Sequence, residues 1–566
     1  MLCPVLCLAQ TSARDTAFRI TSRIVYVDVV VRDRQGNVVH GLSQRDFRLT
    51  EDGAVQSIDY FDERMYPLTV GHGPGVAGTP LAVDSSARAP AASGFSNAPV
   101  PGADAGSISI ILFDLLNTAA TDQEYARRQL LSFLESLPRG QKVALFVLSG
   151  RLQMVQSFTG NSDRLIEMAR HIDPRNFGLI KSDDESMQDV DMFAGFARAV
   201  GATNLMAQVE QAERDEKESD EAIRARITLA ALGELARATS GYPGRKNLLW
   251  LAESFPLTIG AQMEEPKAES RSNLPKARET ANRIADAQIA VYPINLLGLE
   301  TGTLGSDVSG ASSVSAIGAP QGSALNPQMG DTLQTQFTAR AKLRAQMEDL
   351  ASQTGGEPFA STNDFARALR LSMQDGSNYY MLAYRPQNQK WNGRFRKIHL
   401  ELAQKGYSLS YRRGYFALEN TASATSVQEL NAALQPETPE ATMLLLRSQV
   451  ETPGGTVRVR STLDAASLAL NADGDGHRRG RLLVTLVAFP ASQVAAGHAE
   501  PAAPPQTSAV LDLDFDAALY QGALSHGVSF TQQLKLAPGH YRLRLGVTEM
   551  MSHRLGTLDM PVVVDP

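Results

Sequence analysis

The sequence predicts a mixed α/β protein, with a central domain built on a mostly parallel sheet that carries helices on both faces and with β modules at either end. Three observations predict this fold. The run Ile108–Phe113 is nearly all apolar, which is typical of a strand buried on both faces. Strand-like and helix-like patterns then alternate as far as Gln374, as crossover connections require. Before and after this region, short β-branched runs between turn residues predict antiparallel strands.

The first module is predicted at residues 18–65. Ile24–Val31 is rich in β-branched residues, Phe47–Thr50 alternates, and the pair Asp52-Gly53 is a strong hairpin signal. A module of this size rarely buries enough area to fold alone, so we expect it to pack on strands from elsewhere in the chain. Residues 66–106 are rich in Gly, Ala, Pro and Ser, which predicts a flexible linker.

The central domain is predicted at residues 107–376. After the first strand, further strands are predicted at Lys142–Leu148, Leu152–Phe158, Asn247–Leu251 and Ile289–Ile294. Helices are predicted at Gln123–Leu137, Asp163–Ile172, Ile223–Thr239, Lys276–Gln288, Phe337–Gln353 and Asp364–Gln374. Two insertions interrupt this pattern. Residues 173–220 are charged and include a predicted solvated helix, whereas the Gly/Ser/Ala-rich residues 301–335 predict a disordered segment or a mobile flap.

Strand patterns return in residues 377–418, at Tyr379–Tyr384, Lys397–Leu402 and Tyr407–Tyr415. We expect these strands to pack with the first module, so that the central domain is inserted between two halves of one β unit. Residues 440–566 contain short strands separated by turns. This pattern predicts a C-terminal β-sandwich-like domain.

Composition excludes some classes of protein. The 566 residues are 43% hydrophobic and 20% charged with a net charge of −7, so the chain lacks the basic footprint of a nucleic-acid-binding protein. Outside the opening residues, no run of about 18 apolar residues predicts a transmembrane segment.

The opening residues 1–9 resemble the back half of a secretory signal peptide with cleavage after Ala9. No basic residue precedes the apolar run, so either the natural signal is longer or the likeness is accidental. The only cysteines, Cys3 and Cys7, lie in this segment. We therefore expect a secreted, periplasmic or cell-envelope protein whose mature form contains no thiol.

Asp114 follows the first strand of the central domain, and carboxyl ends of parallel strands border the crevice where such sheets bind ligands. Thr118 lies in the same loop, Thr228 near the start of a helix, and Glu253 after a later strand. Mg²⁺ prefers oxygen ligands of these kinds. The sequence therefore predicts a metal site at Asp114, Thr118, Thr228 and Glu253. The alternative is structural, with Asp114 holding the loop by accepting backbone hydrogen bonds.

In this chain, Asp-x-x-x-Thr after a strand is followed by Thr-Leu-x-x-Leu near the start of a helix and by an acid after the fourth strand. This order resembles the three-loop metal-ion-dependent adhesion site of von Willebrand factor type A domains, whose first loop reads Asp-x-Ser-x-Ser. From about residue 20 to residue 416, the chain is similar to the acidobacterial family of secreted von Willebrand factor A-related domain proteins. The matching motifs are Val29–Asp33, Gly41–Phe47, Glu51–Gly53, Gly244–Trp250, Val291–Pro293, Thr354–Gly356, Tyr379-Tyr380 and Arg412–Tyr415. The resemblance implies a Rossmann-like von Willebrand factor A domain.

The acidobacterial family implies the fold but little function. The likeness to the adhesion site implies binding of a protein or other macromolecule through an acidic side chain that completes the coordination of Mg²⁺. The site departs from the family pattern, because Leu116 replaces a hydroxyl ligand and Glu253 replaces the usual Asp. We therefore expect a degenerate adhesion site. The alternative is a metal-free structural or assembly protein of the cell envelope.

A remote alternative is a phosphatase of the haloacid dehalogenase type, with Asp114 as nucleophile. Such an enzyme needs a second Asp two residues later to protonate the leaving group, and this position is Leu116. No other hydrolase motif is present in the sequence. We therefore predict a protein without catalytic residues.

Overall fold

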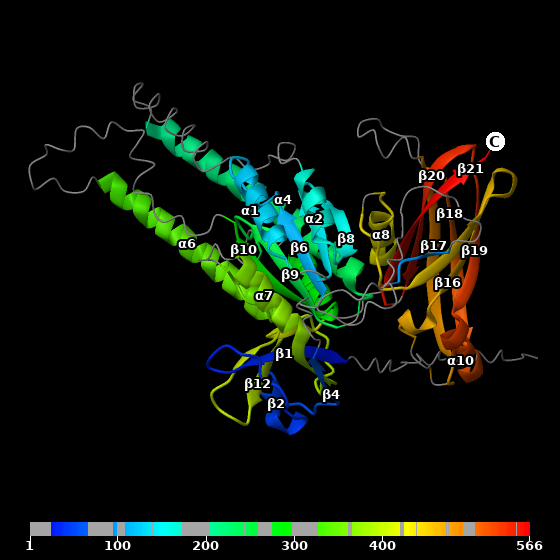
Figure 1. Cartoon of the computed structure of the whole chain (residues 1–566), viewed down its shortest axis with the longest axis horizontal. Helices are drawn as coiled ribbons and strands as arrows, with labels where there is room; N and C mark the ends of the chain where they lie inside the picture. The colour runs from blue at the N-terminus through cyan, green and yellow to red at the C-terminus, as the bar shows by residue number, and fades with distance from the viewer. Residues whose placement is uncertain are drawn as a thin grey trace, which may run out of the picture.

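The structure is a computed structural model (Figure 1), and it describes residues 24–65, 94–98, 108–137, 141–172, 203–242, 244–257, 274–296, 327–359, 365–418, 424–436, 438–470, 473, 475–490, 504–550 and 552–565. The predicted signal segment 1–9, most of the predicted linker and most of the two predicted insertions lie outside these residues. The chain is a mixed α/β protein with several sheets, in agreement with the predicted class.

The central sheet has five strands in the order β10-β9-β6-β7-β8. They are β6 (Ile108–Asp114), β7 (Val143–Leu148), β8 (Leu152–Thr159), β9 (Lys246–Ala252) and β10 (Ile289–Asn295). Strands β10, β9, β6 and β7 are parallel, and β8 is antiparallel to β7. Strands β6, β7, β9 and β10 are buried almost along their whole length because helices cover both faces of the sheet.

Each face of the sheet has its own apolar core. One core contains Trp250 and Val291 together with residues of α4 (Thr203–Thr239), α5 (Leu274–Asp286) and α6 (Pro327–Thr354). The other contains Phe113 and Tyr292 together with residues of α1 (Gln123–Glu135), α2 (Ser162–Arg170) and α7 (Phe365–Ser377). The central domain therefore consists of three layers, with the sheet in the middle (Figure 1).

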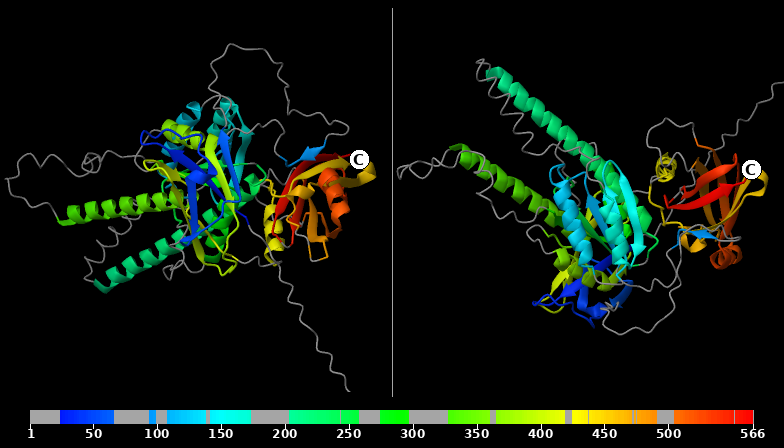
Figure 2. Two further views of the ribbon diagram at one scale, coloured as in Figure 1. Left: turned by 90° about the horizontal axis from the view of Figure 1, so that it is seen from below. Right: turned by 45° about the horizontal axis from the view of Figure 1, so that its top comes forward.

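Helices α4 and α6 are longer than predicted, and their N-terminal parts extend well away from the sheet (Figure 2). They begin inside the two predicted insertions, at Thr203 and Pro327. The sequence explains both starts, because no Gly or Pro interrupts α4 before Gly233 and because proline is well suited to the first turn of a helix. No helix in the described part of the chain is apolar enough over sufficient length to span a membrane.

Strands from both sides of the central domain form a second unit of two antiparallel sheets, β13-β1-β11-β4 and β14-β12-β2-β3. The strands are β1 (Val25–Arg32), β2 (Phe47–Glu51), β3 (Ala54–Val55), β4 (Tyr60–Met65), β11 (Asn378–Tyr384), β12 (Phe395–Leu402), β13 (Ser408–Ser410) and β14 (Gly414–Phe416). A short 3-10 helix, η1 (Gln44–Asp46), precedes β2. Strand β1 pairs with β11, and β2 pairs with β12, so segments more than 300 residues apart share one core. We call this the strand unit.

The strand unit packs at the edge of the central sheet where the parallel strands begin. The backbone N–H of Arg245, just before β9, donates to the Tyr379 hydroxyl at 3.1 Å. Gly355 ends α6 with a φ of +80°, and a Cβ atom there would lie 3.0 Å from the backbone carbon of Tyr411. Glycine therefore suits both the backbone and the close contact. The opposite, carboxyl-terminal edge of the sheet is where Asp114 lies.

The C-terminal unit contains two antiparallel sheets, β19-β16-β15-β5 and β18-β17-β20-β21, around one apolar core. Its strands are β5 (Phe95–Ser96), β15 (Leu446–Glu451), β16 (Thr456–Leu463), β17 (Arg478–Pro490), β18 (Gln506–Phe515), β19 (Val528–Lys535), β20 (Gly539–Glu549) and β21 (Leu555–Val564). It also contains α10 (Ala517–His526), η6 (Pro453–Gly455) and η7 (Ala465–Ser467), and α8 (Ala424–Ala433) packs against it. Neither α8 nor α10 was predicted from the sequence.

Residues 94–98 correct the prediction of a flexible linker over 66–106. They contain β5, which pairs with β15 at the edge of a C-terminal sheet. The buried Asn97 side chain fixes this segment with four hydrogen bonds: it donates to the carbonyls of Ala441, Leu444 and Thr557 at 2.9, 2.9 and 3.1 Å and accepts from the backbone N–H of Leu446 at 2.7 Å. Tertiary contacts therefore order a segment whose composition is that of a linker.

Candidate functional site

The predicted site residues lie at the point where the direction of chain connection reverses. Strands β6 and β9 are neighbours in the middle of the sheet. The chain leaves β6 toward α1 on one face and leaves β9 toward α5 on the other. Ligands of open α/β sheets bind at this kind of switch point, outside the carboxyl ends of the strands. Asp114 ends β6, and Glu253 directly follows β9.

Asp114 is fully buried and accepts several hydrogen bonds. Its Oδ1 accepts from the backbone N–H of Asn117 at 2.9 Å. Its Oδ2 accepts from Asn117 Nδ2 at 2.7 Å and from Trp250 Nε1 at 2.8 Å. Burial raises the pKa of Asp114 to about 6, against the opposing effect of the hydrogen bonds from Asn117 and Trp250. The carboxyl group is therefore held by neutral donors.

The Asn117 side chain connects two of the predicted ligands. Its Nδ2 donates to Asp114 Oδ2 at 2.7 Å and to Thr228 Oγ1 at 3.0 Å. An amide nitrogen thus lies between the two oxygens that the sequence analysis assigned to an ion. Asn117 Oδ1 is buried and has no hydrogen-bond partner among the described residues. A single water molecule would satisfy this oxygen.

The other two predicted ligands have partners of their own. The Thr118 hydroxyl donates to the backbone carbonyl of Asp114 at 2.6 Å. Glu253 Oε2 accepts from the backbone N–H of Ala119 at 2.7 Å. The structure therefore brings all four predicted residues into one neighbourhood, where each of them supports the loop that follows β6 or contacts it.

Further hydrogen bonds fix the loops after β6 and β9 to each other. The backbone N–H of Ser254 donates to the Asn117 carbonyl at 3.0 Å. The buried Gln123 side chain, at the start of α1, donates to the carbonyls of Leu115 and Thr118 at 3.0 and 3.1 Å. Few backbone groups of this turn depend on solvent for a partner, so its conformation is set before any ligand arrives.

These contacts do not fit a Mg²⁺ ion held by Asp114, Thr118, Thr228 and Glu253. A cation needs lone pairs directed toward it, but N–H groups of Asn117 and Trp250 point at the Asp114 carboxylate. Within the part of the chain that the structure describes, no three His, Cys, Asp or Glu side chains form a group that could hold a metal. Leu116, at the position of a missing hydroxyl ligand, is buried in the core on the α4 face.

The same geometry bears on the phosphatase alternative. A nucleophilic carboxylate must reach its substrate, whereas Asp114 is 0% exposed. The acid that such an enzyme needs two residues later is replaced by Leu116, whose side chain packs in an apolar core. The arrangement suits a carboxyl group that holds a loop in place.

Sequence reasoning missed three residues of this network: Asn117, Gln123 and Trp250. Asn117 carried a usable signal, because an Asn three residues after an Asp at a strand end is typical of a side-chain-stabilised turn. Trp250 carried none, since β9 is buried on both faces and its sequence does not show which face the indole occupies. The hydrogen bond from its Nε1 to Asp114 requires the assembled sheet.

In comparisons with known proteins, no family model and no curated protein matches this chain. Solved structures with some likeness include an aerotolerance-related membrane protein from Bacteroides fragilis, with 13% identity over 48% of this chain and 98% of its own and a TM-score of 0.23. BatB from Bacteroides thetaiotaomicron is 10% identical over 48% of this chain and 99% of its own, with a TM-score of 0.22. A von Willebrand factor type A protein from Catenulispora acidiphila is 9% identical over 81% of this chain and 67% of its own, with a TM-score of 0.21. The remote structural neighbours of the chain thus include a von Willebrand factor A protein, an aerotolerance-related membrane protein and BatB.

Proposed function

We propose that this chain is a non-catalytic, exported protein that binds another macromolecule through a von Willebrand factor A-type central domain working without a divalent ion. One observation carries the proposal: the Asn117 amide bridges Asp114 and Thr228 at 2.7 and 3.0 Å. The Asn117 amide is a neutral donor that satisfies the oxygens of Asp114 and Thr228, as a bound ion would otherwise do. It thereby joins the loop after β6 to α4.

The proposed binding surface is the pair of loops after β6 and β9. Ala120 and Thr121 are exposed at the tip of the first loop. Hydrogen bonds from Ser254 to Asn117 and from Ala119 to Glu253 hold the loops together beneath this tip. A surface that is already ordered loses little conformational entropy when a partner binds. The geometry therefore supports recognition by the loops themselves, with no acidic group needed to complete the coordination of an ion.

A metal-free structural or assembly protein of the cell envelope is the second form of this proposal. It rests on the same metal-free loop geometry. The exported location rests on the apolar opening that ends at Ala9, and the von Willebrand factor A assignment rests on the motifs of residues 20–416 together with the strand order and switch point of the central sheet.

Site-specific photo-crosslinking in cells of the source organism tests the proposal. A photoreactive amino acid at Ala120 should give a discrete adduct of higher mass that persists in EDTA. The same amino acid at Arg48, whose side chain is 66% exposed in the strand unit, should not give this adduct. No adduct from Ala120, or one that EDTA abolishes, would contradict a metal-independent binding surface at these loops.

A thermal melt tests the metal-free site directly. The midpoint of unfolding should be the same in EDTA, in Mg²⁺ and in Mn²⁺, because a ligand raises stability only if it binds the native state. An ion at a hundredfold excess over its Kd would add about 2.7 kcal/mol. A rise of that size in the wild-type protein, absent from Asp114→Asn, would restore the adhesion-type metal site.

A further inference from the structure

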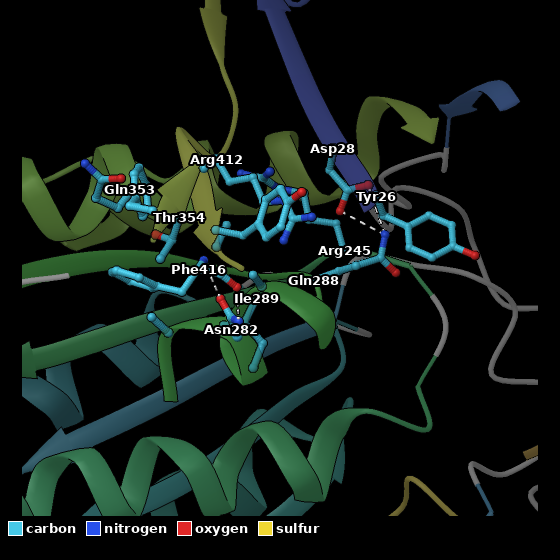
Figure 3. A pocket seen from close by; sticks show the side chains of 16 residues that line it. Tyr26, Asp28, Arg245, Asn282, Gln288, Ile289, Gln353, Thr354, Arg412 and Phe416 are labelled. Atoms are coloured by element: carbon cyan, nitrogen blue, oxygen red, sulfur yellow. Dashed lines mark hydrogen bonds between the residues drawn. The ribbon is translucent and has the colours of Figure 1, made fainter. Parts of the chain in front are cut away.

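A small cavity lies at the junction between the central domain and the strand unit (Figure 3). Asp28 of β1 and Arg412 line it from the strand unit, and Arg245, Gln288 and Thr354 line it from the central domain. Its volume is about 30 Å³, which is enough for about two water molecules or one small ion. The cavity therefore belongs to an interface between two parts of the chain.

Two buried arginines that line this cavity carry N–H groups without a hydrogen-bond acceptor in the part of the chain that the structure describes. Arg412 is 9% exposed, and its Nε and Nη1 are buried with no hydrogen-bond acceptor among the described residues. Arg245 is 4% exposed. Its Nη2 donates to the Gly355 carbonyl at 2.6 Å and to the Tyr292 hydroxyl at 3.1 Å, but its Nε is likewise without a partner. Each buried donor without an acceptor costs stability, so three together indicate an acceptor in the cavity.

The nearby carboxyl groups are used elsewhere. Both oxygens of Asp28 accept from Gln288 Nε2, at 3.0 and 3.1 Å. Asp375 pairs with Arg32 and accepts from the Tyr292 hydroxyl at 2.8 Å. Neither carboxyl group therefore satisfies the free N–H groups of Arg412.

The charge balance favours an anion. Arg245, Arg412 and Lys246 all act electrostatically on Asp28, and this is the one carboxyl group that lines the cavity. Burial raises the pKa of Asp28, against the influence of these three cations and of the hydrogen bond from Gln288. Asp28 and Asp375 both act electrostatically on Arg245. Arg412, whose Nε and Nη1 have no acceptor among the described residues, is therefore the cation to which an entering anion would supply a partner.

We propose that this cavity binds one small monovalent anion, chloride under ordinary ionic conditions, between Arg245 and Arg412. A cavity of about 30 Å³ suits an ion of this size, and a halide accepts hydrogen bonds from N–H groups. Because Arg412 belongs to the strand unit and Arg245 to the central domain, the anion links the two. This site is independent of the function proposed for the loops after β6 and β9.

Two measurements on the full chain test the site. Crystals soaked in bromide should show an anomalous peak within hydrogen-bonding distance of Arg412 Nε or Nη1 and of Arg245 Nε. The thermal midpoint in chloride should exceed the midpoint in gluconate at equal ionic strength by about 2–4 °C, because gluconate is too large for the cavity. Arg412→Met should abolish this difference between the two salts.

Arg413→Met is the matched control, because it removes the same charge from the adjacent exposed residue. This variant should keep the difference between chloride and gluconate. Water instead of bromide at the site would overturn the proposal, and so would a bromide peak without any effect of chloride on the midpoint, which would mean an adventitious ion only. If Arg412→Met does not fold, the bromide peak and the salt comparison in the wild-type protein still decide the question.

Discussion

Asn117 Nδ2 lies 2.7 Å from Asp114 Oδ2, at the place between Asp114 and Thr228 where an adhesion site would hold its ion. Residues that the sequence predicts as metal ligands are therefore joined by hydrogen bonds in the structure. Asp114 accepts from an amide and an indole rather than facing a cation. The loop after β6 is thereby fixed by the chain itself, and the stability of the network becomes measurable by substitution.

Asn117→Ala should lower the free energy of unfolding by about 1–3 kcal/mol, because the buried oxygens of Asp114 and Thr228 then lose a donor. Urea denaturation gives this difference. Asn431→Ala, at an exposed position of α8, should change stability by less than about 0.5 kcal/mol. Equal stability of wild-type protein and Asn117→Ala would mean that the amide does not hold the loop.

Asn117→Asp should create a response to Mg²⁺ that the wild-type protein lacks. The substitution replaces the donor with an acceptor beside Asp114, so two carboxyl groups and the Thr228 hydroxyl meet at one point. Repulsion should destabilise this variant in EDTA, and Mg²⁺ should restore part of the loss because oxygen ligands are now directed at one position. Melts with and without Mg²⁺ check this. A variant indifferent to Mg²⁺ would show that the position cannot accommodate an ion at all.

Stability should fall as the pH rises from about 4 to 7. Burial raises the pKa of Asp114 from 3.8 to about 6, and burial raises that of Glu440 from 4.5 to about 7. The native state therefore binds more protons than the unfolded state in this range, which gives the unfolding free energy a negative slope with pH. The stabilising contribution of each group is complete below the unfolded pKa and is lost as the pH passes through the folded pKa.

Urea midpoints measured at several pH values separate the two groups. Asp114→Asn should flatten the curve between about pH 4 and 6, and Glu440→Gln should flatten it between about pH 4.5 and 7, with about 3 kcal/mol at most from each group. Other buried carboxyl groups also contribute, so the comparison is between the slopes of variant and wild type. A slope that neither substitution alters would show that both groups ionise normally in the native state.

The sequence predicted those parts of the fold that depend on local patterns. The apolar run Ile108–Phe113 corresponds to β6, and the Asp52-Gly53 signal lies at the turn between β2 and β3, where both residues have positive φ. The first module was expected to pack on strands from elsewhere in the chain, and its strands β1 and β2 pair with β11 and β12. In each case the signal comes from burial or from turn geometry.

What the sequence could not predict depends on partners far away in the chain. Strand β5 has only two residues and no periodic pattern, and it exists because Asn97 finds four partners in the C-terminal unit. At the site, proximity of Asp114 and Thr228 follows from the arrangement of the sheet. Whether an ion or an amide lies between these two residues could not be predicted in the same way, because their oxygens can contact either one. Only the assembled structure places Asn117 Nδ2 there.

Asn97→Ala should release residues 94–98 from the C-terminal unit. The substitution removes the acceptor of the Leu446 N–H and the donor to three buried carbonyls, and groups left without partners in the interior cost about 1–3 kcal/mol each. Limited proteolysis should then cut near residue 97, and hydrogen exchange at Leu446 should accelerate. Ser96→Ala, which removes two hydrogen bonds of an exposed side chain, one to the Leu446 carbonyl and one from the Ala98 N–H, should have a much smaller effect. Equal protection of Leu446 in both variants would contradict the role of Asn97.

Glu51→Gln should disrupt the strand unit. Glu51 joins the part of this unit that precedes the central domain in the sequence to the part that follows it. Glu51 Oε1 lies 3.3 Å from Arg396 Nη1, with both side chains 2% exposed, and Oε2 accepts from the hydroxyls of Tyr384 and Tyr415 at 2.7 and 2.9 Å. Removing one partner of a buried ion pair leaves the other charge uncompensated, at a cost of about 3–5 kcal/mol. Urea denaturation measures the loss. Glu401→Gln serves as the control, since the exposed contacts of Glu401 with Arg48 at 3.9 Å and with His399 at 3.1 Å should each contribute less than about 1 kcal/mol. Similar small losses in both variants would mean that the Glu51 cluster does not hold the two halves together.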